Sequence, residues 1–343
     1  MADKKNLSEF ALIERFRSHL PPASKRVIVD IGDDCAVLDS PGRNYQLVST
    51  DALVESIHFD LNTISPEQLG RKSLAVNISD IAAMGGVPHS AVIALGIPSD
   101  LSTKFLDRFY KGIAEHCQNY GLNLVGGDTV ASPKHLFINI TILGEVSKKR
   151  LFTRSGARPG DAIFVTGYPG DSALGLQLLQ SRRKKWNGSA KWKQALTKKH
   201  LDPMPRLAES RRLSRSKARI SSMIDLSDGL VQDLGHILEA SKVGAILNEN
   251  CLPLSPALTN ICELNHLNPL DFTLAGGEDY ELLFTLHPDD VKNLSRQFLT
   301  ADVPVTQIGE ITSATGIQIS REDGSKETLQ NAMGFDHFRK NKP

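Results

Sequence analysis

The chain has 343 residues, which is enough for two domains of ordinary size, each with its own hydrophobic core. Its 40% hydrophobic and 23% charged residues are typical of a globular protein, and a formal net charge of +1 argues against a general attraction to nucleic acid or to a membrane surface. No apolar run approaches the ~20 residues of a membrane span, and no signal peptide is visible, so we expect a cytoplasmic protein. The four cysteines show no CxxC spacing and are expected to be reduced thiols.

Helical and strand patterns alternate in the first half of the chain. The apolar spacing and the capping residues predict helices at residues 8–20, 66–84 and 101–120. Short β-rich runs predict strands at residues 27–30, 45–50, 90–96, 122–125 and 136–144. This alternation predicts an α/β or α+β domain with one layered sheet, which we assign to residues 1–146.

A short basic link at residues 147–150 begins the second predicted domain, residues 147–343. We expect strands at 160–167, 220–225, 282–286 and 305–311, and helices at 171–181, from 205 onward, and at 229–241 with Ser227-Asp228 as its cap. Two basic stretches stand out, at residues 182–199 and 206–219. The first contains two tryptophans, and we interpret it as a solvated insertion, with contact to RNA as the alternative.

Small acidic motifs recur at the ends of apolar or β-rich runs. They are Ile31–Asp34, Ser49–Asp51, Ile78–Asp80, Val125–Asp128, Ile224–Gly229 and Gly276–Asp279. A carboxylate beside glycine at a strand end packs poorly but is well placed to hold a hard cation. Magnesium takes oxygen ligands and is usually shared between a few carboxylates and the phosphates of a substrate. The motifs therefore predict a magnesium-dependent enzyme that acts on nucleotide phosphates.

The strongest individual signals are aspartates that simpler roles do not explain. Asp33 and Asp34 would repel each other by about 4 kcal/mol at ~4 Å and an effective dielectric constant of about 20, which requires a cation or protons unless the turn is solvated. Asp80 lies in an apolar helical pattern and needs a partner, because an unpaired buried carboxylate is costly. Capping of the next helix accounts for Ser227 or Asp228 but leaves Asp225 unexplained.

Other candidates have an ordinary alternative. Ser49-Thr50-Asp51 suits magnesium or caps the next segment, and His58 is structural or donates to a phosphate. The Gly126-Gly127-Asp128 turn offers N–H groups for a phosphate, although it matches neither the P-loop nor the dinucleotide fingerprint. Arg154 is a phosphate clamp or an ordinary loop arginine.

Taken together and in this order, the motifs resemble those of the thiamine-monophosphate kinase family, within the aminoimidazole-ribonucleotide-synthetase-like ATP-binding superfamily. The resemblance spans almost the whole chain. It is carried by Ile31–Asp34, Thr50-Asp51 with His58-Phe59, Val76–Gly86, Arg108–Tyr110, Val125–Asp128, Arg154–Ala157, Ile224–Leu230, Gly276–Tyr280 and Gly334–Phe338.

The resemblance implies transfer of the γ-phosphoryl group of ATP to thiamine monophosphate, with several Mg²⁺ ions. The magnesium ligands that it implies are Asp34, Ser49, Thr50, Asp51, Asp80, Asp128, Asp225 and Asp228. The ATP contacts that it implies are Tyr110, Gly127, Asp128, Arg154 and Ser227. The contacts to the thiamine substrate that it implies are His58, Glu278 and Phe335.

The resemblance also implies a two-domain synthetase-like fold. Its N-terminal mixed sheet would pair across a homodimer, and its C-terminal α/β domain would cover the site. The expected partners are ATP and thiamine monophosphate, with no nucleic acid and no membrane. Another ATP-dependent synthetase of the superfamily is the closest alternative, although the reactive or C-terminal cysteines of two such enzymes have no counterpart here. A non-catalytic nucleotide-binding or metal-binding module is the other, and turnover separates it from an enzyme.

Overall fold

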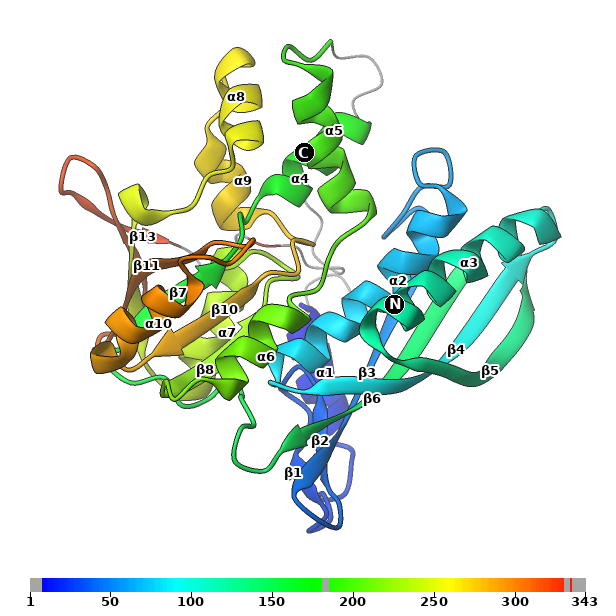
Figure 1. The fold of residues 1–343 in the computed structure, drawn as a ribbon, viewed down its shortest axis with the longest axis horizontal. Coiled ribbons are helices and arrows are strands. Elements are labelled where there is room, and N and C mark those ends of the chain that lie inside the picture. Colours follow the sequence, from blue (N-terminus) through cyan, green and yellow to red (C-terminus); the bar gives the residue numbers. More distant parts are fainter. Residues whose placement is uncertain (1–7, 181–184, 330–333, 335–343) are drawn as a thin grey trace.

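The computed structural model describes residues 8–180, 185–329 and 334, and it contains two mixed sheets with helices packed against them (Figure 1). The expected mixed α/β class is therefore confirmed. The strands of the first sheet end with Ser147, and those of the second begin with Ala162, so the predicted boundary falls at the end of a strand. In the described part of the chain, no helix is both long enough and apolar enough to cross a bilayer.

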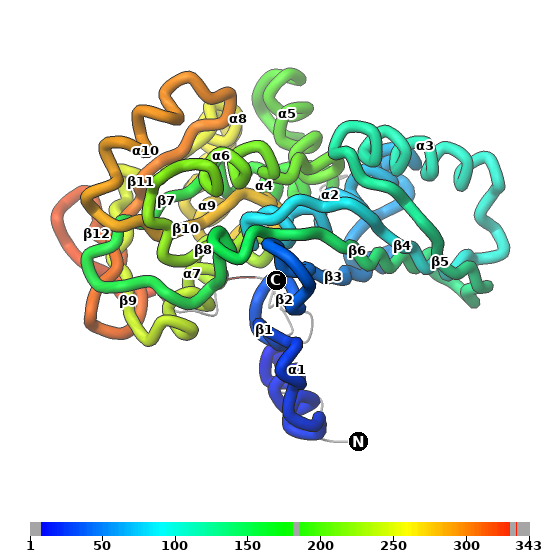
Figure 2. The backbone as a smooth tube through the Cα atoms, turned by 60° about the horizontal axis from the view of Figure 1, so that its bottom comes forward, coloured from blue at the N-terminus to red at the C-terminus, as the bar shows by residue number. Residues whose placement is uncertain are grey.

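The first sheet has six strands in the order β1-β2-β3-β6-β4-β5. These are β1 (Val27–Val29), β2 (Ala36–Asp39), β3 (Asn44–Val54), β4 (Val87–Pro98), β5 (Asn123–Ser132) and β6 (Phe137–Ser147). Helix α2 (Pro66–Ala83) packs on the sheet and α3 (Thr103–Tyr120) packs on α2. Helix α1 (Glu9–Arg17) projects away from the rest of the domain, as Figure 2 shows.

The second sheet has seven strands in the order β13-β12-β9-β11-β7-β10-β8. These are β7 (Ala162–Thr166), β8 (Ile220–Asp225), β9 (Gly244–Asn248), β10 (Leu282–Leu286), β11 (Val305–Thr312), β12 (Gly316–Ser320) and β13 (Lys326–Leu329). The α-helices are α4 (Asp171–Gln180), α5 (Ala190–Leu201), α6 (Leu207–Arg215), α7 (Leu230–Ser241), α8 (Pro256–Leu264), α9 (Pro269–Ala275) and α10 (Val291–Phe298). Two short 3₁₀ turns are η1 (Glu249–Cys251) and η2 (Pro288–Asp290).

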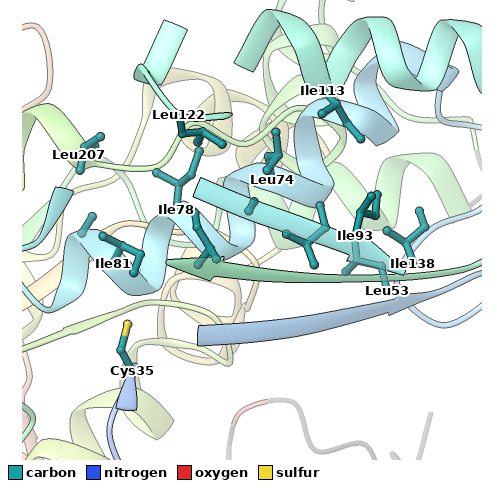
Figure 3. Packing of buried hydrophobic residues seen from close by; sticks show 14 of the residues in the cluster. Cys35, Leu53, Leu74, Ile78, Ile81, Ile93, Ile113, Leu122, Ile138 and Leu207 are labelled. Carbon is teal, nitrogen blue, oxygen red and sulfur yellow. The ribbon is translucent and has the colours of Figure 1, made fainter. Parts of the chain in front are cut away.

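Helix α2 is buried on nearly all sides because it lies between the two domains. Leu74, Ile78 and Ile81 pack in the core of the first domain, which Figure 3 shows together with residues of the sheet. On the other side, the Ser210 hydroxyl of α6 donates to the Ala82 carbonyl at 2.5 Å. A capping box at Ser65 fixes the start of the helix. The position of α2 is therefore determined by both domains.

Two expected strand ends are wrong, because the strands continue through the acidic motifs. Strand β3 pairs with β6 along its whole length, so Thr50 and Asp51 lie in the middle of the strand. Strand β5 likewise includes Gly126-Gly127-Asp128, which pairs with β4 across a bulge. A Cβ on Gly127 would lie 1.8 Å from the Ile93 carbonyl oxygen, so this close strand approach explains the glycine.

The expectation of a solvated insertion at residues 182–199 is also wrong for most of the segment. Trp186 and Leu196 are buried in a small core with residues of α4 and α8. Helix α5 forms much of the segment and packs against α4 and α8. Lys191 and Lys198 lie on the exposed surface of this packed helix, whereas Lys199 faces inward and pairs with the buried Glu281 at 3.3 Å.

Candidate functional site

A cavity of about 1180 Å³ contains most of the predicted site residues. It lies between the two domains, and its walls come from α1, α2, β3, the loop after β1, and the loops that follow β8 and α9. The predicted residues that line it are Asp34, Ser49, Thr50, Asp51, His58, Asp80, Arg154, Asp225, Ser227, Asp228 and Glu278. Residues from both halves of the chain thus form one site.

The centre of the cavity is a cluster of aspartates from different elements. Asp80 of α2 accepts a hydrogen bond from the Ser49 hydroxyl of β3 and is also hydrogen-bonded to Asp51. Two carboxyl groups can share a hydrogen bond only if one of them holds a proton. Asp225, at the end of β8, accepts from the Ser79 hydroxyl of α2 at 2.5 Å. Helix α2 therefore connects the acids of the two domains.

Asp33 and Asp34 form a second acidic wall, and Arg154 lies against it. The Arg154 guanidinium approaches Asp34 Oδ1 at 2.5 Å, and the Arg154 backbone N–H donates to Asp33 at 3.1 Å. The other Asp34 oxygen, Oδ2, is buried and has no hydrogen-bond partner among the described residues. The predicted phosphate clamp is thus held by a carboxylate that has one oxygen left to bind a cation.

The aspartates of the cavity resist ionisation. Burial and the negative charge of Asp34 raise the pKa of Asp225 to about 8, and burial raises that of Asp51 to about 6. Burial and the neighbouring Asp34 raise the pKa of Asp33 to about 7. Burial, together with Asp51, Asp225 and Asp34, raises the pKa of Asp80 well above its usual value. Near neutral pH, ionisation of the whole cluster is therefore unfavourable without cations.

Two loops of the second domain lie side by side along the cavity. The Glu278 N–H donates to the Ser227 carbonyl at 2.7 Å, and the Tyr280 N–H donates to the Leu226 carbonyl at 2.8 Å. A Cβ on Gly277 would lie 2.5 Å from the Ser227 carbonyl oxygen, which explains the glycine there. Glu278 and Tyr280 have φ values of 62° and 52°, a strained conformation for such residues. Backbone pairing between the loops holds Glu278 in that conformation.

The expected cap of α7 is wrong. Its N-cap is Gly229, and neither Ser227 nor Asp228 caps the helix with its side chain. Instead, the Asp233 carboxylate accepts hydrogen bonds from the backbone N–H groups of Ser227, Asp228 and Gly229, each at 3.1 Å. Asp233 of the first helical turn thereby fixes the loop that carries the predicted ligands.

Asp228, Asp233 and His236 are the only described trio of His, Cys, Asp or Glu with ligand atoms all within 4.8 Å of one another. The other described acids of the cavity form no trio this tight, although Asp51 and Asp80 are hydrogen-bonded as a pair. Such spacing suits Mg²⁺, which keeps several waters and takes further ligands from substrate phosphates.

Glu278 has a buried cationic partner that the sequence analysis did not identify. Lys72 of α2 is 1% exposed, and its Nζ lies 2.9 Å from Glu278 Oε1. His200 Nδ1 lies 3.3 Å from Glu278 Oε2. Burial would raise the pKa of Glu278, but Lys72 and His200 lower it below its usual value. Glu278 is therefore an ionised carboxylate at the cavity wall, and Lys72 and His200 hold it in place.

Three predicted ATP contacts lie outside the lining of the cavity. Gly127 and Asp128 are in the edge strand β5, and Tyr110 is on the outer surface of α3. The strand register places Gly127 three strands from Asp51, a separation of about 14 Å at the usual spacing of strands. Thr50 lines the cavity, but its hydroxyl lies 2.9 Å from that of Thr141 on β6. Phe335 lies outside the described residues.

Lys72, Asp233, His200 and His236 are the main residues of the site that the motifs did not reveal. Lys72 offered a signal, because a lysine at a buried position of an apolar helix needs a partner charge. The role of Asp233 depends on the backbone conformation of a loop, and His200 comes from a distant helix. No sequence pattern indicated a role for Asp233 or His200.

Comparison with known proteins identifies the family. Models of the AIR synthase related protein match the chain, the N-terminal domain over residues 32–146 and the C-terminal domain over residues 158–321. The thiamine-monophosphate kinase of Escherichia coli (strain K12) is 41% identical over 333 residues, which cover 96% of this chain and 98% of that protein. The chain belongs to the thiamine-monophosphate kinase family.

Further relatives agree with this assignment, and the chain is accordingly a kinase. The thiamine-monophosphate kinase of Bacillus subtilis (strain 168) is 35% identical over 313 residues, 91% of this chain and 94% of that protein. A solved structure described as AaThiL complexed with AMPPCP and TMP is 34% identical, with a TM-score of 0.81 over 96% of this chain and 97% of that one. The hydrogenase maturation protein HypE in complex with ATP, at 20% identity and a TM-score of 0.67, shares the fold.

The raised pKa values predict how pH changes the stability of the metal-free kinase. Between about pH 6.5 and about pH 8, native Asp33 and Asp225 retain protons that unfolded aspartates have lost, so stability decreases as pH rises. Below about pH 6.5, buried histidines with a pKa of about 4, such as His200, act in the opposite direction. We expect Tm to fall across this window in metal-free buffer, and Mg²⁺ to raise Tm more at its upper end.

Differential scanning fluorimetry measures these shifts. Asp225→Asn should flatten the decline in Tm, because the amide does not ionise. Asp107→Asn, at an exposed position of α3, should leave the decline unchanged. A Tm of the metal-free protein that rises across the window would contradict the burial of these acids.

The Lys72–Glu278 pair predicts a large loss of stability when the lysine is removed. Lys72→Met leaves the Glu278 carboxylate without its cation, and breaking such a buried pair costs about 3–5 kcal/mol. Urea unfolding measures the change. Lys72→Met with Glu278→Gln should recover part of the loss, whereas Lys111→Met on the exposed side of α3 should have little effect. A loss equal to that of Lys111→Met would show that the pair is not stabilising.

Proposed function

We propose that this kinase transfers the γ-phosphoryl group of ATP to the phosphate of thiamine monophosphate, giving thiamine diphosphate and ADP. The observation that carries the proposal is the convergence of Asp34, Asp51, Asp80 and Asp225 on one interdomain cavity. The related structure described with AMPPCP and TMP supports the choice of substrates, since AMPPCP is an analogue of ATP. At about 1180 Å³, the cavity has room for two small phosphorylated molecules.

The residues present fit magnesium. The donors at the centre are carboxylate and hydroxyl oxygens, the ligands that a hard cation prefers, and the buried Asp34 Oδ2 has no hydrogen-bond partner among the described residues. Asp34, Ser49, Asp51, Asp80, Asp225 and Asp228 would hold several such ions. When bound, Mg²⁺ neutralises phosphate charge and orients the reacting groups.

The protein's own residues bind and orient two anions. The acceptor phosphate is already ionised near neutral pH, so the reaction needs no general base, and we infer direct in-line transfer. The raised pKa values of Asp33 and Asp225 keep protons on the acids until cations replace them. Glu278, with its charge fixed by Lys72, presents an ionised carboxylate to the cationic thiamine substrate. The loop pairing through Ser227 positions this carboxylate beside the acidic cluster.

We also propose that the kinase is a homodimer that pairs through the first sheet. Strand β5 is a ten-residue edge strand that pairs with β4 on one side only. It exposes two apolar side chains, Val125 at 62% and Val130 at 55%. A long edge strand of this kind is a template for pairing with another chain. Pairing at this edge would cover Gly127 and Asp128 with residues of a second copy.

The test of the function is ADP release with thiamine monophosphate as acceptor, with and without Mg²⁺. Asp51→Asn should lower kcat at least a thousandfold, because the amide removes a charged metal ligand from the centre of the cavity. Asp107→Asn, which removes an exposed carboxylate from α3, is the matched control and should retain the full rate.

A near-normal rate in Asp51→Asn would remove this residue from the metal site. ADP release that is independent of thiamine monophosphate would refute the acceptor. With γ-labelled ATP, the label should appear in thiamine diphosphate and none should remain on the protein. A stable labelled protein would replace direct transfer by a phosphoenzyme route.

The test of the dimer is the mass in solution. Val130→Glu places a charge on the exposed edge of β5, so the mass from light scattering should fall from two chains to one. Leu299→Glu, at a side chain of the second domain that is 77% exposed, should leave the mass unchanged. A wild-type mass of one chain, or an unchanged mass in Val130→Glu, would exclude this interface.

A further inference from the structure

A second concavity, of about 890 Å³, lies between α6 and α10 in the second domain. Both helices contribute to the core on one face of the second sheet, through Leu213 and Leu294 (Figure 1). Its charged lining residues are Arg211, Arg212, Arg215, Lys217 and Asp290. We call this concavity the basic pocket. It shares no lining residue with the acidic cavity, so it is a separate site.

The positive charge of the basic pocket is not neutralised from within. Its one carboxylate, Asp290, is bound by Arg219, whose Nε and backbone N–H lie 2.8 Å and 2.9 Å from Asp290 Oδ2. In the part of the chain that the structure describes, none of the ion pairs involves Arg211, Arg215 or Lys217. Four cations in a concavity concentrate a positive potential there.

Stabilisation of the helix end does not account for this arrangement. Arg212 and Arg215 lie in the last turn of α6, where cations interact favourably with the helix dipole. However, Ser216 already donates to two carbonyls of this turn, with its N–H to those of Arg212 and Leu213 and with its hydroxyl to that of Leu213 at 2.7 Å. Arg211 lies before the last turn and Lys217 lies beyond the helix. The cations are therefore available to a ligand.

Uncharged donors complete one wall of the basic pocket. Helix α10 starts at Val291 with no side-chain cap, because the carboxylate of its N-cap residue is held by Arg219. Asn293 and Gln297 are four residues apart on the helix face that lines the pocket. The Arg212 guanidinium is anchored 5.3 Å from the centroid of the Phe298 ring. The pocket thus combines amide groups with guanidinium groups.

We propose that the basic pocket binds a small anion that carries two or more phosphate charges. Guanidinium groups match phosphate oxygens with paired N–H donors. The volume is within the roughly 300–1,000 Å³ of small-molecule sites. No lining residue is aromatic, so the pocket lacks the stacking surfaces with which proteins bind single-stranded nucleic acid. The observations therefore favour a compact phosphate ligand over RNA.

The test is calorimetric titration of the full chain with inorganic pyrophosphate in buffer freed of metal by a chelating resin. Without metal, the acidic cavity lacks the cations that its carboxylates and a phosphate would share, whereas the basic pocket needs no metal. We expect one pyrophosphate per chain. Arg211→Gln with Arg215→Gln should weaken binding at least tenfold, since one charge-assisted hydrogen bond contributes about that factor.

The matched control is Lys191→Gln with Lys198→Gln, which removes two exposed charges from α5 and should change Kd less than about twofold. Circular dichroism and kinase activity should be normal in both double variants. The proposal is overturned if pyrophosphate does not bind, if the arginine variant binds normally, or if both variants lose affinity equally. Tighter binding of a ten-nucleotide RNA, lost in the arginine variant alone, would assign the pocket to nucleic acid instead.

Discussion

The repulsion among buried carboxylates is the constraint on which the site depends. Asp34, Asp51, Asp80 and Asp225 come from a loop, two strands and a helix, and burial raises the pKa of each. The fold holds them together because α2 is packed by both domains: its Asp80 accepts a hydrogen bond from Ser49 of β3, and its Ser79 donates one to Asp225 of β8. Protons or cations must then balance the charge. Rigid packing of α2 therefore keeps these carboxylates together, which is what the proposed metal site requires.

In the second domain, an ionised carboxylate is held at the cavity by loop contacts and by an ion pair. The loops after β8 and α9 bring Ser227 and Glu278 to the cavity, and the second loop is strained, with φ of 62° at Glu278. Backbone hydrogen bonds between the loops compensate for that strain, and three bonds to Asp233 fix the first loop. Lys72 reaches across from the first domain to balance the charge of Glu278. The ionisation of Glu278 therefore depends on a contact between the two domains.

The sequence was sufficient to predict the order of most elements and many of the polar residues that line the cavity. Apolar periodicity located α2 to within one residue, and the acidic motifs identified Asp34, Asp80 and Asp225. Local patterns did not show where β3 and β5 end, because pairing with β6 and β4 extends both strands. The role of Lys72 depends on a contact between distant segments, and that of Asp233 on the backbone conformation of the adjacent loop. Distances of this kind are set by packing, which a single sequence does not reveal.

The acidic cavity and the basic pocket, both proposed to bind anions, are lined by side chains of opposite charge. The acidic cavity is lined with carboxylates, so in the proposed function phosphates would enter it together with cations that neutralise both sides. The basic pocket carries its positive charge on arginines and lysine, so it requires no metal. Strand β8 connects them, since it begins after Ala218 of the pocket and ends at Asp225 of the cavity. Metal concentration should therefore separate the two sites, with the cavity dependent on Mg²⁺ and the pocket dependent only on ionic strength.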